Sequence, residues 1–195
     1  MPRSAPAGTA DRILDLAERL VQTRGFNDFS YADIAEQLGI RKASLHHHFA
    51  TKGDLGRRLM VRYHDRFRGA LAGIETRVQA PGRRLQAYAA LYEGVLRDGG
   101  RMCLCGMLAA DFSTLPKGIR DEVRRFFDTN ERWLSRVLSA GRRTRALKFD
   151  GSPEGEARVL LDGLEGAMLI ARTYEDPDRF VSTARHLLAA LGIRG

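Results

Sequence analysis

The 195-residue chain is long enough for one or two domains with a buried core, and its 44% hydrophobic and 29% charged residues are typical of a soluble globular protein. A formal net charge of +8 permits a polyanionic partner such as nucleic acid, without requiring one. There is no apolar run of about 18 residues to cross a membrane and no apolar segment near Met1 to act as a signal peptide, and two cysteines are too few for a secreted disulfide scaffold. We therefore expect a cytoplasmic protein without a membrane partner.

Apolar residues recur at helical spacing along most of the chain, and no segment alternates as a half-buried strand would. A first helix is predicted from about Asp11 to the stop at Gly25. Ser30 followed by Asp33 resembles a capping box and predicts a second helix, which Gly39 ends. The pattern indicates an all-α fold.

A third short helix is predicted over about 42–48, and Thr51 then caps a long helix that Pro81-Gly82 breaks. The polar and basic segment 141–151 is predicted to be a loop or a frayed helix end. The remaining helices are predicted over about 84–97, from Pro116 to about 140, from Ser152-Pro153 to about 174, and from Asp176-Pro177 to about 191, with a short apolar stretch over 102–112.

Three short helices before a long one, with a glycine between the second and third, are the organisation of a helix-turn-helix. Ile34, Leu45 and Phe49 supply the apolar contacts that hold the two helices together. The segment 41–58 contains five Lys or Arg residues against one acidic residue, a pattern that favours phosphate binding.

Several spaced motifs lie in this region. Gly25-Phe26 ends the first helix, Ser30 precedes Ile34-Ala35, and the segment 45–55 reads LHHHFATKGDL. With these motifs, the stretch 13–55 resembles the DNA-binding domain of TetR-class transcriptional regulators. The resemblance implies a helix-turn-helix domain over residues 1–55 and a larger helical domain for effector binding and dimerisation over residues 56–195.

The resemblance also implies which residues contact DNA. Arg41, Lys42, Ser44 and His47 would face the major groove, and Ser30, Tyr31, His46 and Lys52 would hold phosphates. Two positions depart from the family pattern. His46 stands where a Tyr is usual, and Arg41 stands where a Ser or Thr usually caps the recognition helix.

The C-terminal domain has no comparable motif, so its sites are predicted from composition. An apolar pocket would accept a small-molecule effector, and the last two helices would form a four-helix interface in a homodimer, although both sets could instead be ordinary core. The predicted pocket residues are Tyr63, Phe67, Tyr88, Tyr92, Met102, Cys105, Phe126 and Trp133. The predicted interface residues are Leu160, Leu164, Ala167, Met168, Ala171, Leu187 and Leu191.

Cys103 and Cys105 would lie about 200° apart on a helix, so they cannot form a disulfide there. One thiol could sense oxidants or electrophiles, or both could pack as small apolar residues. The consecutive residues His46, His47 and His48 point about 100° apart and cannot share one metal, so no metal site and no cofactor are predicted.

No nucleophile, zinc-protease or nucleotide-binding motif occurs, so the protein is not predicted to be an enzyme. The function predicted is a DNA-binding transcriptional repressor, released from a palindromic operator in double-stranded DNA by a small molecule. Two alternatives stay open at this point: a thiol-sensing repressor and a DNA-binding protein that responds to no ligand.

Overall fold

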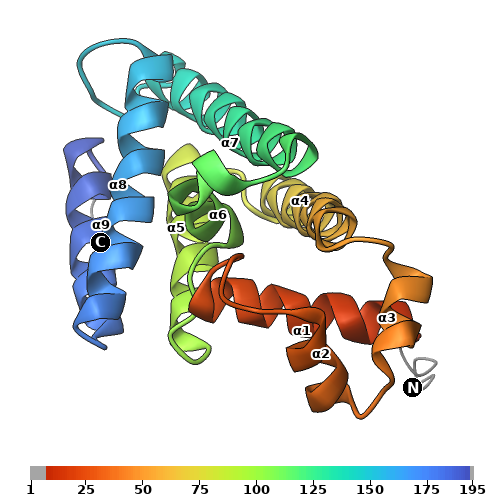
Figure 1. The fold of residues 1–195 in the computed structure, drawn as a ribbon. Coiled ribbons are helices and arrows are strands. Elements are labelled where there is room, and N and C mark those ends of the chain that lie inside the picture. The colour runs from red at the N-terminus through yellow and green to blue at the C-terminus, as the bar shows by residue number, and fades with distance from the viewer. Residues whose placement is uncertain (1–7, 194–195) are drawn as a thin grey trace, which may run out of the picture.

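Every regular element among residues 8–193, the part of the chain that the computed structural model describes, is helical (Figure 1). This confirms the all-α prediction. The α-helices are α1 (Thr9–Arg24), α2 (Tyr31–Leu38), α3 (Lys42–His48), α4 (Lys52–Arg77), α5 (Pro81–Arg97), α6 (Leu104–Ala110), α7 (Lys117–Arg143), α8 (Pro153–Thr173) and α9 (Pro177–Ala190). A single 3-10 turn, η1 (Phe112–Thr114), lies between α6 and α7.

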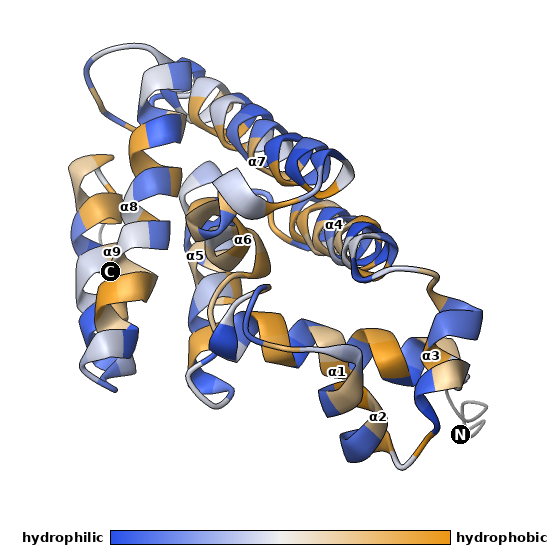
Figure 2. Ribbon diagram, in the orientation of Figure 1, coloured by the Kyte–Doolittle hydropathy of each residue, from blue (hydrophilic) through white to orange (hydrophobic). Residues whose placement is uncertain are grey.

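The helices divide into two ends joined by α4 (Figure 1). Helices α1, α2 and α3 lie together at one end, and α8 and α9 lie side by side at the other. Helix α8 packs against both α7 and α9, while α4 contacts α1 on one side and α7 on the other. Hydrophilic residues cover much of the outer side of α7, whereas apolar residues recur along α1 and α8 (Figure 2). The predicted domain boundary at residue 55 falls inside the first turns of α4.

The helix boundaries follow proline and capping chemistry. Helix α5 begins at Pro81 itself, not near residue 84, because proline lacks the N–H that the first turn leaves unused and has a helical φ. Pro153 and Pro177 begin α8 and α9 as predicted, after the caps Ser152 and Asp176. Helix α7 continues to residue 143, so the predicted loop over 141–151 is three residues too long at its start.

Ion pairs attach α1 to α4. Arg62 on α4 lies 2.8 Å from Asp15 and 3.5 Å from Glu18, and Arg66 lies 2.5 Å from the same Glu18 carboxylate. Glu18 is almost fully buried, so these pairs are less screened by solvent than surface pairs. These ion pairs add to the apolar contacts that hold the N-terminal helices against α4.

A close approach at Gly56 predicts the effect of a substitution there. A Cβ atom at this position would lie 2.5 Å from Ile119 Cδ1 on α7 and 2.7 Å from Phe26 Cε2. We expect Gly56→Ala to lower the free energy of unfolding by about 1–3 kcal/mol, because packed side chains must shift. Gly69→Ala is the control, since nothing lies within 4 Å of its Cβ position on the same helix. Chemical denaturation should show Gly69→Ala to be neutral or slightly stabilising, and equal destabilisation by both would contradict the packing argument.

Candidate DNA-binding surface and effector site

The turn between α2 and α3 is built by a cap, a glycine and three buried side chains. The Ser30 hydroxyl accepts hydrogen bonds from the backbone N–H groups of Ala32 and Asp33, and the Asp33 carboxylate accepts one from the Ser30 N–H. Gly39 ends α2 with a left-handed φ of 64°, which glycine adopts without steric cost. Ile34, Leu45 and Phe49 are fully buried, as the helix-turn-helix requires.

One side of α3 is left for a partner. Arg41, Lys42, His46 and His47 are exposed on it, and Ser44 is half-buried. Arg41 precedes the first turn without a side-chain capping bond, in line with the missing Ser or Thr. The groove-facing residues predicted from the sequence therefore share one accessible surface, and Arg41 and Lys42 are its cations.

Two of the predicted phosphate contacts point inward instead. Tyr31 is 6% exposed, and its hydroxyl donates a 2.9 Å hydrogen bond to the Phe49 carbonyl. Burial, with Asp54 nearby, raises the pKa of Tyr31 to about 12. The centroid of its ring lies 4.9 Å from the centroid of the His46 ring. Tyr31 therefore packs against the exposed imidazole and helps to position it.

Lys52 is the other inward residue. Its ammonium group donates to the Phe29 carbonyl and lies over the rings of Phe26 and Phe29, 4.8 and 4.2 Å from their centroids. Burial lowers the pKa of Lys52. These contacts tie the start of α4 to the α1–α2 connection, so the structure uses the Lys52 charge within the domain.

Six of the predicted effector-site residues form one aromatic cluster. Between ring centroids, Phe67 lies 4.9 Å from Phe126 and 6.2 Å from both Tyr88 and Tyr92. Tyr88 also stacks on Trp133, with 5.5 Å between their centroids. Tyr63 adds a ring 5.7 Å from Phe126. Helices α4, α5 and α7 thus bring these residues together, packed against one another.

A buried asparagine links this cluster and was not predicted. Asn130 on α7 is 0% exposed, accepts a 2.8 Å hydrogen bond from the Tyr88 hydroxyl and donates one to the Phe126 carbonyl. Tyr88 and Tyr92 share a further 3.1 Å hydrogen bond, while the Trp133 indole N–H is buried without a partner. The signal in the sequence is a single amide within the apolar stripe of α7.

An open pocket lies beside the cluster, between α6, α7 and α8. Its volume is about 420 Å³, and of the eight predicted pocket residues only Met102 is among those that line it. Glu165 on α8 also lines it. Both of its carboxyl oxygens are buried near Cys103 and Tyr92, and within residues 8–193 neither makes a hydrogen bond of normal geometry. Burial raises the pKa of Glu165 well above its usual range, with Cys103 as the next cause. In the sequence, Glu165 could have been noticed as an acidic residue that lies between two core residues of the same helix, Leu164 and Met168.

The cysteines lie in the core near this pocket. Cys103 is 2% exposed and Cys105 is 0% exposed. Burial raises the pKa of Cys105, whereas for Cys103 neighbouring donors, the Cys105 thiol first, outweigh burial and lower the pKa to about 6. The Tyr63 hydroxyl lies 3.8 Å from the Cys103 sulfur. Because both thiols are shielded from solvent, the thiol-sensing alternative is not favoured.

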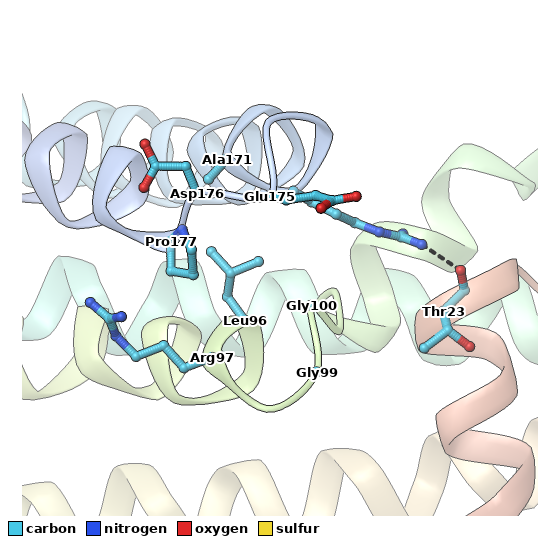
Figure 3. A pocket seen from close by; sticks show the side chains of 10 residues that line it. Thr23, Leu96, Arg97, Gly99, Gly100, Ala171, Glu175, Asp176 and Pro177 are labelled. Atoms are coloured by element: carbon cyan, nitrogen blue, oxygen red, sulfur yellow. Dashed lines mark hydrogen bonds between the residues drawn. The ribbon is translucent and has the colours of Figure 1, made fainter.

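Several contacts join the end of α1 to the C-terminal helices. The Met102 N–H donates to the Gln22 carbonyl at 3.2 Å, and the Phe26 N–H donates to the Asp111 carboxylate at 2.9 Å. Arg172 near the end of α8 donates to the Thr23 carbonyl beside a second pocket of about 460 Å³ (Figure 3). Hydrogen bonds from the region around α6 and from the end of α8 therefore fix the position of the C-terminus of α1.

The predicted dimer residues lie mostly in the core of the protomer. Leu160, Leu164, Met168, Ala171 and Leu191 are at most 3% exposed, and Ala167 and Leu187 are half-buried. Leu187 packs on Gly163, where a Cβ would lie 2.8 Å from Leu187 Cδ1. The large apolar side chains exposed along α8 and at its C-cap are Val159, Leu169, Ile170 and Tyr174, at 56, 51, 49 and 63%.

Within residues 8–193, no group of three or more His, Cys, Asp or Glu side chains is placed to hold a metal ion. No helix in that range is both long and apolar enough to span a membrane.

Two family models match this chain. The model of bacterial regulatory proteins of the tetR family matches residues 13–59, and that of the tetracyclin repressor-like C-terminal domain matches residues 81–187. The HTH-type transcriptional repressor DhaR of Mycobacterium sp. (strain GP1) is 27% identical over 175 residues, which cover 87% of each chain. The transcriptional regulator AcuR of Cereibacter sphaeroides is 29% identical over 191 residues, covering 94% of this chain and 86% of the relative.

Solved structures agree with these matches. A TetR-family transcriptional regulator from Agrobacterium tumefaciens is 36% identical with a TM-score of 0.91, covering 93% of this chain and 96% of the other. A TetR transcriptional regulator from Legionella pneumophila is 30% identical with a TM-score of 0.86, covering 95% and 98%. The chain belongs to the TetR family and is a DNA-binding transcriptional regulator.

Proposed function

We propose that the protein is a homodimeric repressor that binds a palindromic operator in the cytoplasm and is released by a small molecule. The exposed cationic side of α3, held by Leu45 and Phe49 against α2, is the observation that carries the DNA-binding part of this proposal. Two such helices in a two-fold dimer would enter successive major grooves about 34–36 Å apart. DhaR, which is described as a repressor, supports the sign of regulation.

We propose fewer DNA-contacting residues than the sequence alone predicted. Arg41, Lys42, Ser44 and His47 would read base edges or groove walls, and Ser30 and His46 would reach phosphates. Tyr31 and Lys52 would act indirectly, by holding His46 and the start of α4 in place.

The proposed dimer uses the side of α8 that the protomer leaves uncovered. Gly166, Ile170 and Tyr174 follow Val159 by 7, 11 and 15 residues, so they lie on the same side of the helix at 3.6 residues per turn. None of residues 8–193 lies within 4 Å of a Cβ at Gly166, which allows close approach to the α8 backbone. We name this side, Val159, Gly166, Ile170 and Tyr174, the α8 face.

The proposed release works through the contacts at the end of α1. Met102 and Met107 line the α6–α8 pocket, and each also contacts the link to the DNA-binding domain: the Met102 N–H donates to Gln22, and Arg172 bridges Met107 and Thr23. A ligand that prefers a shifted α6 would therefore move α1 and change the spacing of the two α3 helices. A preference of a few kcal/mol is sufficient.

Selection of random duplex DNA with the purified protein, followed by salt titration of the enriched site, tests this function. We expect a palindrome with two half-sites, and an affinity that falls with salt by about 0.9 in log–log slope for each phosphate contact. Enrichment of no sequence, with only salt-sensitive binding to any duplex, would contradict operator recognition.

A further inference from the structure

The pocket between α6, α7 and α8 combines an apolar wall with acidic groups. Met107, Phe127, Leu161 and Leu169 contribute apolar surface to it. Its volume of about 420 Å³ lies within the range of small-molecule sites, about 300–1,000 Å³. A pocket of this kind fits a ligand with an apolar body and one polar head.

Glu165 supplies the polar group for that head. Both of its carboxyl oxygens are buried. The Cys103 thiol and the Tyr92 hydroxyl lie near them, but neither oxygen makes a hydrogen bond of normal geometry with any of residues 8–193. The carboxyl group occupies the space above Gly106, where a Cβ would lie 2.5 Å from Glu165 Oε2. A buried polar group without a partner destabilises the fold, so its retention beside an open pocket indicates a partner from outside the chain.

The acidic residues around the pocket favour a ligand whose polar head is positively charged. Glu131 and Asp162 also line it, and none of the described residues that do so is Lys, Arg or His. Glu131 is paired with Arg158 at 3.3 Å, whereas no cation is paired with Glu165. Burial raises the pKa of Glu165, and a cation placed against the carboxyl would favour its charged form.

We propose that this pocket binds an amphiphilic organic amine, with its ammonium group against Glu165 and its apolar body against Phe127, Leu161 and Leu169. The proposal deepens the proposed function by naming the chemical class of the effector, and it rests on that function only for the regulatory consequence. Binding would replace an unpartnered buried carboxyl with an ion pair inside an apolar wall.

Calorimetry on the full-length dimer without DNA tests the proposal with three probes that share one body: 4-phenylbutylamine, 4-phenyl-1-butanol and 4-phenylbutyrate. We expect the amine to bind at least about tenfold more tightly than the alcohol, because hydrogen bonds to a charged group are stronger than neutral ones, and the carboxylate to bind weakest. In Glu165→Gln, which keeps the shape and removes the charge, the ratio of amine to alcohol should fall to within about threefold. Glu156→Gln, on α8 outside the pocket, should retain the ratio of the unsubstituted protein.

Gly106→Ala gives a second test that leaves Glu165 in the chain. Its Cβ would displace the carboxyl group, so the preference for the amine should again fall, with circular dichroism used to verify that both variants fold. Equal binding of the three probes to the unsubstituted protein, or a preference for the amine that survives both substitutions, would overturn the proposal.

Operator binding measured without any probe separates this inference from the proposed function. Tight binding to a selected palindrome together with no preference for the amine would overturn the amine site alone. Preference for the amine without binding to any enriched DNA sequence would overturn the operator function and leave the amine site standing.

Discussion

Ile170→Glu is expected to convert the dimer into folded monomers. Ile170 is 49% exposed at the centre of the α8 face, so a protomer tolerates a charge there. In a two-fold dimer the same position is used by both chains, and two glutamates would be buried near each other without a partner. Because an uncompensated buried charge costs several kcal/mol, we expect dimerisation to weaken by at least about 100-fold.

Sedimentation measures this directly, as a fall in particle mass from twice 21.8 kDa to 21.8 kDa at micromolar protein. Operator affinity should fall with it, since a monomer presents only one recognition helix. Val61→Glu is the matched control, because Val61 is an exposed apolar residue, 37% accessible, on α4 and away from the α8 face. A stable Ile170→Glu dimer would exclude the α8 face as the interface.

The double substitution Arg41→Ala, Lys42→Ala is expected to weaken operator binding by about 100-fold or more. Both side chains are exposed and make no ion pair with any of residues 8–193, so their removal should leave stability unchanged within about 0.5 kcal/mol. Each base or phosphate contact contributes about 1–3 kcal/mol, and the loss doubles in a dimer that uses two recognition helices. Fluorescence anisotropy with the selected operator measures the change, and the salt dependence should become less steep.

A control with equal charge loss distinguishes local contacts from net charge. Arg143→Ala, Lys148→Ala removes one Arg and one Lys that are exposed near the connection between α7 and α8, at the far end of the molecule from α3 (Figure 1). We expect this pair to change operator affinity less than about threefold. Similar losses from both double variants would show that affinity depends on the overall positive charge instead of on α3.

Features with a local cause could be predicted from the sequence. The cap at Ser30, the left-handed turn at Gly39 and the helix starts at Pro153 and Pro177 depend on backbone groups within a few residues. Local chemistry does not determine where a helix ends if a further helical turn is compatible with both solvent exposure and packing. For this reason the end of α7 differs from the prediction by about three residues.

The direction of a side chain is harder to predict than its residue type. The motif that contains Tyr31 and Lys52 indicates DNA binding, yet both polar groups bond to backbone carbonyls inside the domain. On α8, periodicity reveals an apolar stripe but not its partner, and Leu160, Leu164 and Met168 are taken up by the core of the protomer. The stripe that faces inward is the more apolar one, which leaves the α8 face as the candidate for a second chain.

The sequence by itself determined the all-helical fold, the helix-turn-helix with its exposed cationic helix and the family, because each depends on residue spacing and local backbone constraints. Only the tertiary structure decided that Asn130 joins the aromatic cluster and that Glu165 lies unpartnered beside an open pocket. These two sites depend on α5, α6, α7 and α8 meeting in space. Burial, which raises the pKa of Glu165 and shields Cys103 from solvent, arises from contacts between segments far apart in the chain, and no local pattern predicts it.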